Sequence, residues 1–178
     1  METLKLTPGE SVSIRSSTPE ALEVEATYAP GGEPPPKHLH PAQDEHFRCL
    51  AGSVRVRVGD HQRELEVGEE IEIPRRTAHQ MWNPSAEPAR VAWTTRPAGR
   101  TLEWFRSVDA LHRSGRVNEQ GVPGPLGFAV LIDEFSDSFR LAVGPDPLVR
   151  VAIAGLALVG RARGYRATPS SPPPRSTG

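Results

Sequence analysis

Hydrophobic and polar residues alternate in short runs along the first half of the chain. Residues 54–58 read Val-Arg-Val-Arg-Val, and a similar alternation runs through 22–28, 70–73 and 90–95. A period of two places one set of side chains on a core and the other in water, as on a half-buried β-strand. The pattern therefore predicts a series of short strands.

Turn-forming residues separate these runs. Glycine, proline, asparagine or aspartate marks a break at 30–32, 51–52, 59–60, 67–68 and 83–84. Many short strands at this spacing are typical of a β-sandwich or β-barrel. We therefore expect residues 1–97 to form a mostly β domain.

The pattern changes to a helical period in the second half of the chain. Residues 101–114 place Trp104, Val108 and Leu111 on one stripe, and Gly115 follows as a C-terminal stop. A second helix is expected to begin at Pro125, because proline suits a first helical turn. Apolar side chains then recur at helical spacing, namely Phe128, Leu131, Phe135 and Phe139.

A third helix is expected from Asp146-Pro147, read as an N-cap and a first helical position, to about Gly164. Together the three helices define an extension at residues 98–166. Each helix carries an apolar stripe, so we expect the extension to pack on the barrel or on a partner subunit. Residues 167–178 are rich in proline and serine and are predicted to be disordered.

Composition narrows the classes of function. The 178 residues carry 21 basic and 22 acidic side chains and a net charge of -1, which gives no electrostatic reason to expect a nucleic-acid partner. The N-terminus lacks the unbroken apolar core of a signal peptide, and the single cysteine, Cys49, is expected to be a plain buried residue. The most apolar stretch, residues 148–160, is shorter than the roughly 20 residues that span a bilayer. We therefore expect a cytoplasmic protein that does not span a membrane.

Four side chains in the predicted β domain carry candidate chemistry. His38 and His40 are two residues apart, so an extended strand points both imidazoles to the same face. Glu45 lies far enough beyond His40 for a turn and the start of the next strand, and His79 opens a later strand. His46 should face the opposite side from Glu45 and is expected not to bind a metal.

Three histidines and one carboxylate that converge in a barrel form a typical site for one first-row divalent metal ion. Fe²⁺ and Mn²⁺ are favoured, and Zn²⁺, Ni²⁺ and Cu²⁺ also fit such ligands. An octahedral ion would keep about two positions open for water, dioxygen or substrate.

These segments resemble the two motifs of the cupin superfamily over roughly residues 20–97. The first motif, G-x5-H-x-H-x3/4-E-x6-G, is matched completely by Gly32, His38, His40, Glu45 and Gly52. The second, G-x5-P-x-G-x2-H-x3-N, is matched by Gly68, Pro74, His79 and Asn83, with Arg76 in place of the central glycine.

The resemblance implies a double-stranded β-helix, a jelly-roll barrel of two facing antiparallel sheets. It also implies that His38, His40, Glu45 and His79 are the metal ligands, that the partner is a small molecule, and that the chain forms a homodimer. Glycine at the position of Arg76 often serves a positive φ, which another residue can adopt at modest cost. We therefore expect the metal site to survive this substitution.

Three functions remain open on this reading. A metal-dependent enzyme of the oxygenase type, acting on a small organic substrate, is favoured, and Glu45 is a candidate base. One alternative is a non-catalytic binding or sensing module, because no second acid–base pair is visible. Another alternative is a metal-dependent isomerase. The helix expected at 101–114 does not look like a DNA-recognition helix, which argues against a transcription factor.

Overall fold

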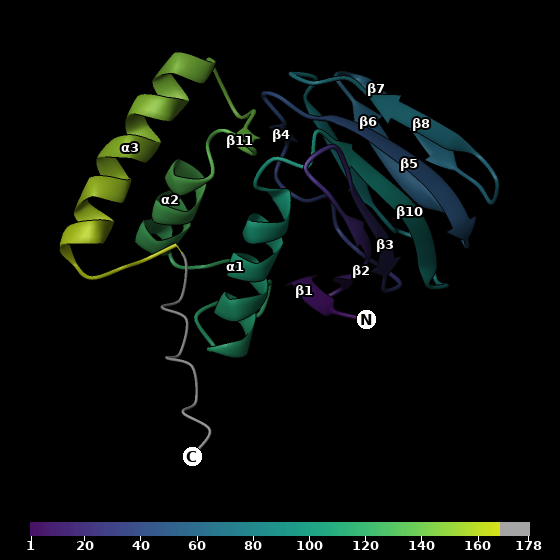
Figure 1. Cartoon of the computed structure of the whole chain (residues 1–178), viewed down its shortest axis with the longest axis horizontal. Coiled ribbons are helices and arrows are strands. Elements are labelled where there is room, and N and C mark those ends of the chain that lie inside the picture. The colour runs from purple at the N-terminus through teal and green to yellow at the C-terminus, as the bar shows by residue number, and fades with distance from the viewer. Residues whose placement is uncertain (168–178) are drawn as a thin grey trace.

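A computed structural model describes residues 1–167 and contains two antiparallel β-sheets and three helices (Figure 1). The first sheet has the strand order β1-β2-β3-β10-β5-β8, and the second has the order β11-β4-β9-β6-β7. The strands are β1 (Thr3–Thr7), β2 (Glu10–Ser17), β3 (Leu22–Tyr28), β4 (His38–Leu39), β5 (Asp44–Ala51), β6 (Val54–Val58), β7 (His61–Leu65), β8 (Glu70–Ile73), β9 (His79–Trp82), β10 (Ala89–Arg96) and β11 (Arg140–Leu141). Residues 168–178, which make up nearly all of the tail expected to be disordered, lie outside the described residues.

The two sheets share one hydrophobic core. Val24 and Val91 enter it from the first sheet, and Val56 and Met81 enter it from the second. Strand β3 buries every second residue, as its alternating sequence predicted. Cys49 lies in the same core, which confirms it as a buried small residue. The predicted fold class, a mostly β jelly roll followed by three helices, is confirmed.

The helices α1 (Thr101–Arg113), α2 (Pro125–Glu134) and α3 (Asp146–Ala162) follow the barrel. Figure 1 shows α1 beside the sheets, α2 next to it and α3 at the far end. Helix α1 has two apolar sides, because Phe105 enters the barrel core while Val108 and Leu111 contact a cluster built mainly from α2 and α3. The predicted stripe of Trp104, Val108 and Leu111 is therefore the contact between the first helix and the other two.

The second helix ends earlier than its sequence pattern predicted. Helix α2 stops at Glu134, and the carbonyl oxygen of Phe135 accepts hydrogen bonds from the N–H groups of Ser138 (2.9 Å) and Phe139 (2.8 Å). Phe139 lies outside the helix, and its ring stacks between Trp104 of α1 and His38 of the barrel. Packing between distant segments thus outweighs the helical spacing of the phenylalanines.

The third helix begins one residue earlier than expected. Pro145, and not Asp146, is the N-cap, and no side chain forms a hydrogen bond that caps this end. Asp146 lies in the first turn, where a negative charge interacts favourably with the helix dipole.

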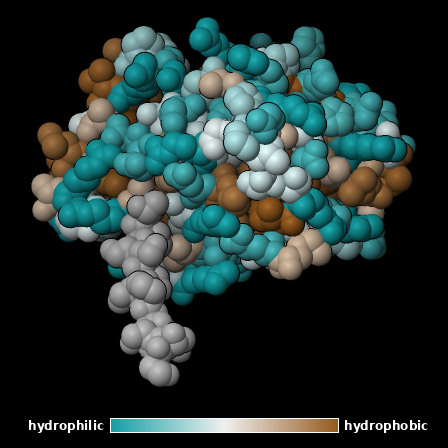
Figure 2. All heavy atoms as spheres, viewed as in Figure 1, coloured by the Kyte–Doolittle hydropathy of each residue, from teal (hydrophilic) through white to brown (hydrophobic). Residues whose placement is uncertain are grey.

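Helix α3 packs on α2, and the outer face of α3 is exposed. Its buried residues are Ala157 and Gly160, whereas Leu148, Val151 and Leu158 are 69%, 73% and 70% exposed. Figure 2 shows this apolar surface as brown atoms at the α3 end of the molecule. No helix within residues 1–167 is both long and apolar enough to cross a membrane.

Arg76 adopts a backbone conformation that glycine favours. Its φ is 65°, and no other non-glycine residue in the described part of the chain has a positive φ. The N–H of Arg76 donates to the carbonyl oxygen of His40 (2.8 Å), so this turn joins the segments that carry the two motifs. A side chain in the left-handed region costs on the order of 1 kcal/mol.

We expect Arg76→Gly to stabilise the protein by about 0.5–1 kcal/mol, because glycine removes the strain at positive φ although it adds freedom to the unfolded chain. Urea unfolding followed by circular dichroism measures the change. Arg76→Ala is the control, since it removes the same charged group but keeps a Cβ, and it should give no gain. Equal stabilities of the glycine and alanine variants would contradict the strained turn.

The contact between α2 and α3 depends on a glycine. A Cβ at Gly160 would lie 2.7 Å from Val130 Cγ2 and 2.9 Å from the carbonyl oxygen of Leu126, whereas a Cβ at Gly155 meets open space. We expect Gly160→Ala to destabilise the protein by about 1–3 kcal/mol, because the two helices must move apart. Gly155→Ala, the matched change on the exposed face, should stabilise it by up to about 1 kcal/mol through helix propensity. Thermal unfolding of the two variants should show opposite shifts, and a gain at both positions would refute this packing.

Candidate metal centre

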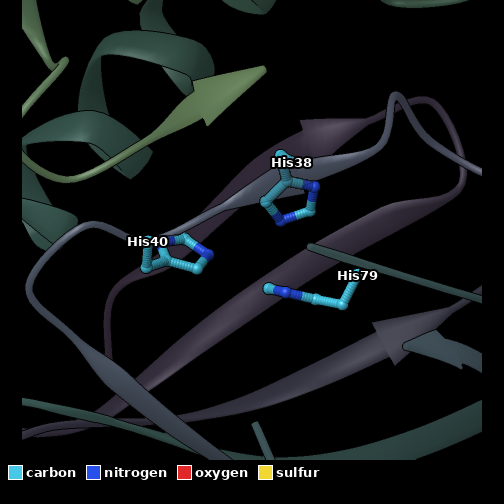
Figure 3. A group of neighbouring side chains, drawn as sticks. All are labelled: His38, His40 and His79. Carbon is cyan, nitrogen blue, oxygen red and sulfur yellow. The ribbon is translucent and has the colours of Figure 1, made fainter. Parts of the chain in front are cut away.

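Three histidines meet where β4 lies beside β9. His38 in β4 pairs directly with His79 at the start of β9, and His40 follows the end of β4. One nitrogen from each imidazole lies within 4.8 Å of the others. Figure 3 shows the three rings around a common space. The structure thus brings together the three histidines that the sequence singled out.

Backbone carbonyls hold each imidazole ring. The Nδ1 atoms of His38, His40 and His79 lie 3.0, 2.6 and 3.0 Å from the carbonyl oxygens of Pro36, Ser138 and Thr77, respectively. A carbonyl oxygen only accepts, so each Nδ1 carries the proton and donates. When the ring is neutral, each Nε2 then has its lone pair free, which is the form of histidine that binds a metal.

Glu45 lies beside two of the histidines. Its Oε2 is 3.2 Å from His40 Nε2 and 3.0 Å from His79 Nε2, and the side chains of all three residues are almost completely buried. Its Oε1 accepts a hydrogen bond from the indole Nε1–H of Trp93 (3.1 Å). The carboxylate is therefore held from one side by β10 and faces the histidines on the other.

The same contacts set the charges of the site. Burial alone would raise the pKa of Glu45, but His40 and His79 outweigh it and hold that pKa at about 2. Burial lowers the pKa of His40 and lowers that of His38 well below its usual value. Burial would also lower the pKa of His79, yet the contact with Glu45 prevails and raises it. Glu45 is thus ionised, and His38 and His40 are neutral at neutral pH, as metal binding requires.

This donor set fits a divalent cation. His40 Nε2 and Glu45 Oε2 are buried, and neither forms a hydrogen bond of acceptable geometry within the described residues. Unsatisfied buried polar atoms are costly and call for a partner. Imidazole nitrogens and a carboxylate oxygen are ligands that first-row divalent metals accept. The cluster therefore suggests a bound metal ion and leaves its identity open.

Other polar residues of the two motif segments have partners or positions of their own. His46 Nε2 is 3.4 Å from Glu70 Oε2, which pairs His46 with an exposed carboxylate instead. The guanidinium of Arg75 donates two hydrogen bonds to Asp44, so its charge is already paired. Gln43 is buried, and its Oε1 has no hydrogen-bond partner within the described residues.

Sequence reasoning missed three contacts of the site. Trp93 was recognised only as one member of an alternating strand, although its position in the β10–β5 pairing places it beside Glu45. The carbonyl of Ser138 and the ring of Phe139 come from the helical extension, far along the chain from the motifs. The aromatic character of Trp93 and Phe139 was visible, but nothing in the sequence placed either residue at the histidines.

Comparisons with known proteins agree with this fold and arrangement. Residues 24–95 match the family model of the cupin domain. The structure of KdgF from Halomonas sp. matches with a TM-score of 0.51 at 20% identity, covering 57% of this chain and 93% of that chain. An RmlC-like cupin from Shewanella frigidimarina NCIMB 400 matches with a TM-score of 0.52 at 19% identity, covering 57% of this chain and 87% of that chain.

At such low sequence identity, the two structures show the fold alone. No curated protein matches the chain significantly. The family model and the fold agree with each other over the segment that carries both motifs. Residues 24–95 therefore form a cupin domain.

Proposed function

We propose that this cupin is a metal-dependent enzyme of the oxygenase type that acts on a small organic substrate. One divalent metal would be held by His38, His40, Glu45 and His79. The observation that carries the proposal is the meeting of three imidazole nitrogens, those of His40 and His79 buried, beside the buried carboxylate of Glu45. Fe²⁺ and Mn²⁺ are the favoured ions, while Zn²⁺, Ni²⁺ and Cu²⁺ accept the same ligands.

The chain's own residues would bind and orient the ion. The carbonyls of Pro36 and Thr77 fix the rings of His38 and His79, and Trp93 fixes one oxygen of Glu45. The bound ion would supply open coordination positions for dioxygen and substrate. A carboxylate with a pKa of about 2 is a weak base, so Glu45 suits the role of ligand better than that of proton acceptor.

The surroundings of the carboxylate are apolar on the side of Trp93. Trp93 contacts the rings of Phe47 in β5 and Phe105 in α1, at 5.3 and 5.1 Å between ring centroids, and both phenylalanines lie in the hydrophobic core. This core excludes water from that side of Glu45, which strengthens the interaction of the carboxylate with a bound cation.

A non-catalytic binding module is the second candidate, and the depth of the site favours it. The side chains of Glu45 and His79 are only 1% and 3% exposed. A metal enclosed to this degree could organise the barrel or hold a ligand without turnover. The experiments below separate the two functions.

Removal of a proposed ligand should abolish stoichiometric metal binding. We expect about one equivalent of metal in wild-type protein purified anaerobically without a histidine tag. His79→Ala and Glu45→Gln should each weaken metal affinity by more than 100-fold, because loss of an outer contact to a ligand already costs about 10–100-fold. His46→Ala, which removes a neighbouring histidine on the outer side, is the control and should retain the metal. Equal metal content in all four proteins, by elemental analysis, would place the ion elsewhere.

The oxygenase proposal is tested with the Fe²⁺-loaded wild-type protein. A panel of small phenols, thiols and 1,3-diketones is added under air, and dioxygen uptake is followed with an electrode. Uptake that depends on one class of compound and is lost in His79→Ala would support an oxygenase. Turnover that continues without dioxygen would instead support the isomerase, and a panel compound that binds tightly and is recovered unchanged would support the binding module.

Metal binding should release a proton near neutral pH. The contact with Glu45 raises the pKa of His79, so in the metal-free protein His79 keeps its proton to a higher pH than an ordinary histidine does. That proton must leave before Nε2 can bind an ion, so affinity should rise with pH above about 6.5 and level off once His79 is neutral. Calorimetry of Zn²⁺ binding in buffers of different ionisation enthalpy counts the protons. Release of up to one proton is expected; no release at any pH from 6 to 8 would show that His79 is already neutral.

A further inference from the structure

A short segment of the helical extension joins the sheet that carries the histidines. Arg140 and Leu141 of β11 pair with Leu39 and His38 of β4, and the N–H of Ala142 donates to the carbonyl oxygen of Lys37 (2.8 Å). Strand β4 is only two residues long and lies between β11 and β9 in the sheet. The extension therefore supplies one of the two neighbours that hold this strand in place.

The segment also contacts two histidine rings directly. The ring of Phe139 stacks on His38, with centroids 4.6 Å apart and an angle of 18° between the planes. The same ring meets the edge of His40 at 6.1 Å. The carbonyl oxygen of the preceding residue, Ser138, accepts the buried hydrogen bond from His40 Nδ1. Phe139 thus lies against two of the three rings that enclose the candidate metal position.

A second aromatic ring supports Phe139 from behind. Trp104 of α1 stacks on it at 4.6 Å between centroids, with only 12° between the planes. Trp104 in turn meets Phe135 edge-on at 5.7 Å. A ring packed between His38 and Trp104 has little freedom to turn aside, since each stacked contact adds to its burial.

The remaining contacts of the site come from the barrel. Glu45, His79 and Trp93 belong to β5, β9 and β10, and the two carboxylate-contacting histidines are almost fully buried. A surface hollow of about 430 Å³ is lined by Glu45, although by none of His38, His40 and His79. On the other side of the site, Phe139 covers the ring of His38, so a molecule that approaches His38 from the helical extension must displace or pass Phe139.

We infer that Phe139, presented by the helical extension and backed by Trp104, is the wall of the metal centre on the side of His38 and decides which molecules reach the ion from that side. The inference rests on the metal site proposed above. Phe139 is a specificity-determining and positioning residue: it blocks bulky ligands by steric contact and keeps His38 in its binding orientation. Specificity then arises from exclusion, as in other sites where a clash rejects the wrong partner.

The test uses the full-length protein loaded with Co²⁺, whose visible absorption spectrum reports ligand geometry and the binding of added ligands. Two probes are titrated: azide, which is small and linear, and 4-nitrocatechol, which is broad and flat. The variants are Phe139→Ala, Phe139→Leu and Phe139→Tyr. Phe128→Ala is the matched control, because it removes an equal number of atoms from a half-buried phenylalanine of α2.

We expect azide to bind wild type and Phe139→Ala alike, and 4-nitrocatechol to bind Phe139→Ala at least about tenfold more tightly than wild type. Phe139→Tyr should restore the exclusion, and Phe128→Ala should behave as wild type. The Co²⁺ spectrum of Phe139→Ala should also shift, because His38 loses the ring stacked on it. Phe139→Leu replaces Phe139→Ala if the alanine variant folds poorly. Because leucine is apolar but smaller than phenylalanine, this variant should also bind 4-nitrocatechol more tightly than wild type does.

The two proposals fail in different ways. If wild type and Phe128→Ala take up no Co²⁺, the metal centre itself is wrong and the inference falls with it. The other outcome is that wild type binds Co²⁺, but 4-nitrocatechol has the same affinity for wild type as for Phe139→Ala and Phe139→Leu. The metal centre then stands and the role of Phe139 is refuted.

Discussion

The buried charge of Glu45 is the constraint on which the rest of the site depends. A carboxylate moved from water into a protein interior costs several kcal/mol unless charges and hydrogen bonds replace its hydration. Here the indole of Trp93 binds one oxygen, and the Nε2 atoms of His40 and His79 lie 3.2 and 3.0 Å from the other. These partners come from β10, from β9 and from the segment after β4, so the charge is tolerated only when the barrel is closed. A divalent cation at this point would compensate the charge and also bind the imidazole nitrogens.

Local signals made the strands and the candidate ligands predictable. Hydrophobic and charged residues alternate at 54–58 because one face of β6 lies on the core. This periodicity can be recognised from the five residues of the strand alone. The spacing of His38 and His40 likewise forces both rings to one side of an extended chain. Even the substitution at Arg76 could be interpreted, since a glycine in the motif points to a positive φ and the arginine adopts one. The roles of the four residues as ligands stay a proposal.

Contacts between distant segments could not be predicted in the same way. Ser138 and His40 are 98 residues apart, and nothing near either residue indicates the other. Strand β11 has two residues, too few for any period to appear. Phe139 fitted a helical pattern with Phe135, but α2 ends at Glu134 and the ring of Phe139 stacks between Trp104 and His38. The register of β10 against β5, which brings Trp93 to Glu45, is also a property of the assembled sheet.

The late position of Phe139 in the chain has a consequence for biosynthesis. All four candidate ligands and every strand of the barrel except β11 precede residue 97, whereas the segment that covers the histidines follows α2. Domains fold from the N-terminus as the ribosome releases them, at about 5–20 residues per second. The barrel can therefore form while its covering segment is still being made. The stacking of Phe139 on His38 is then among the last contacts of the site to form, after the strands that carry the four candidate ligands have paired.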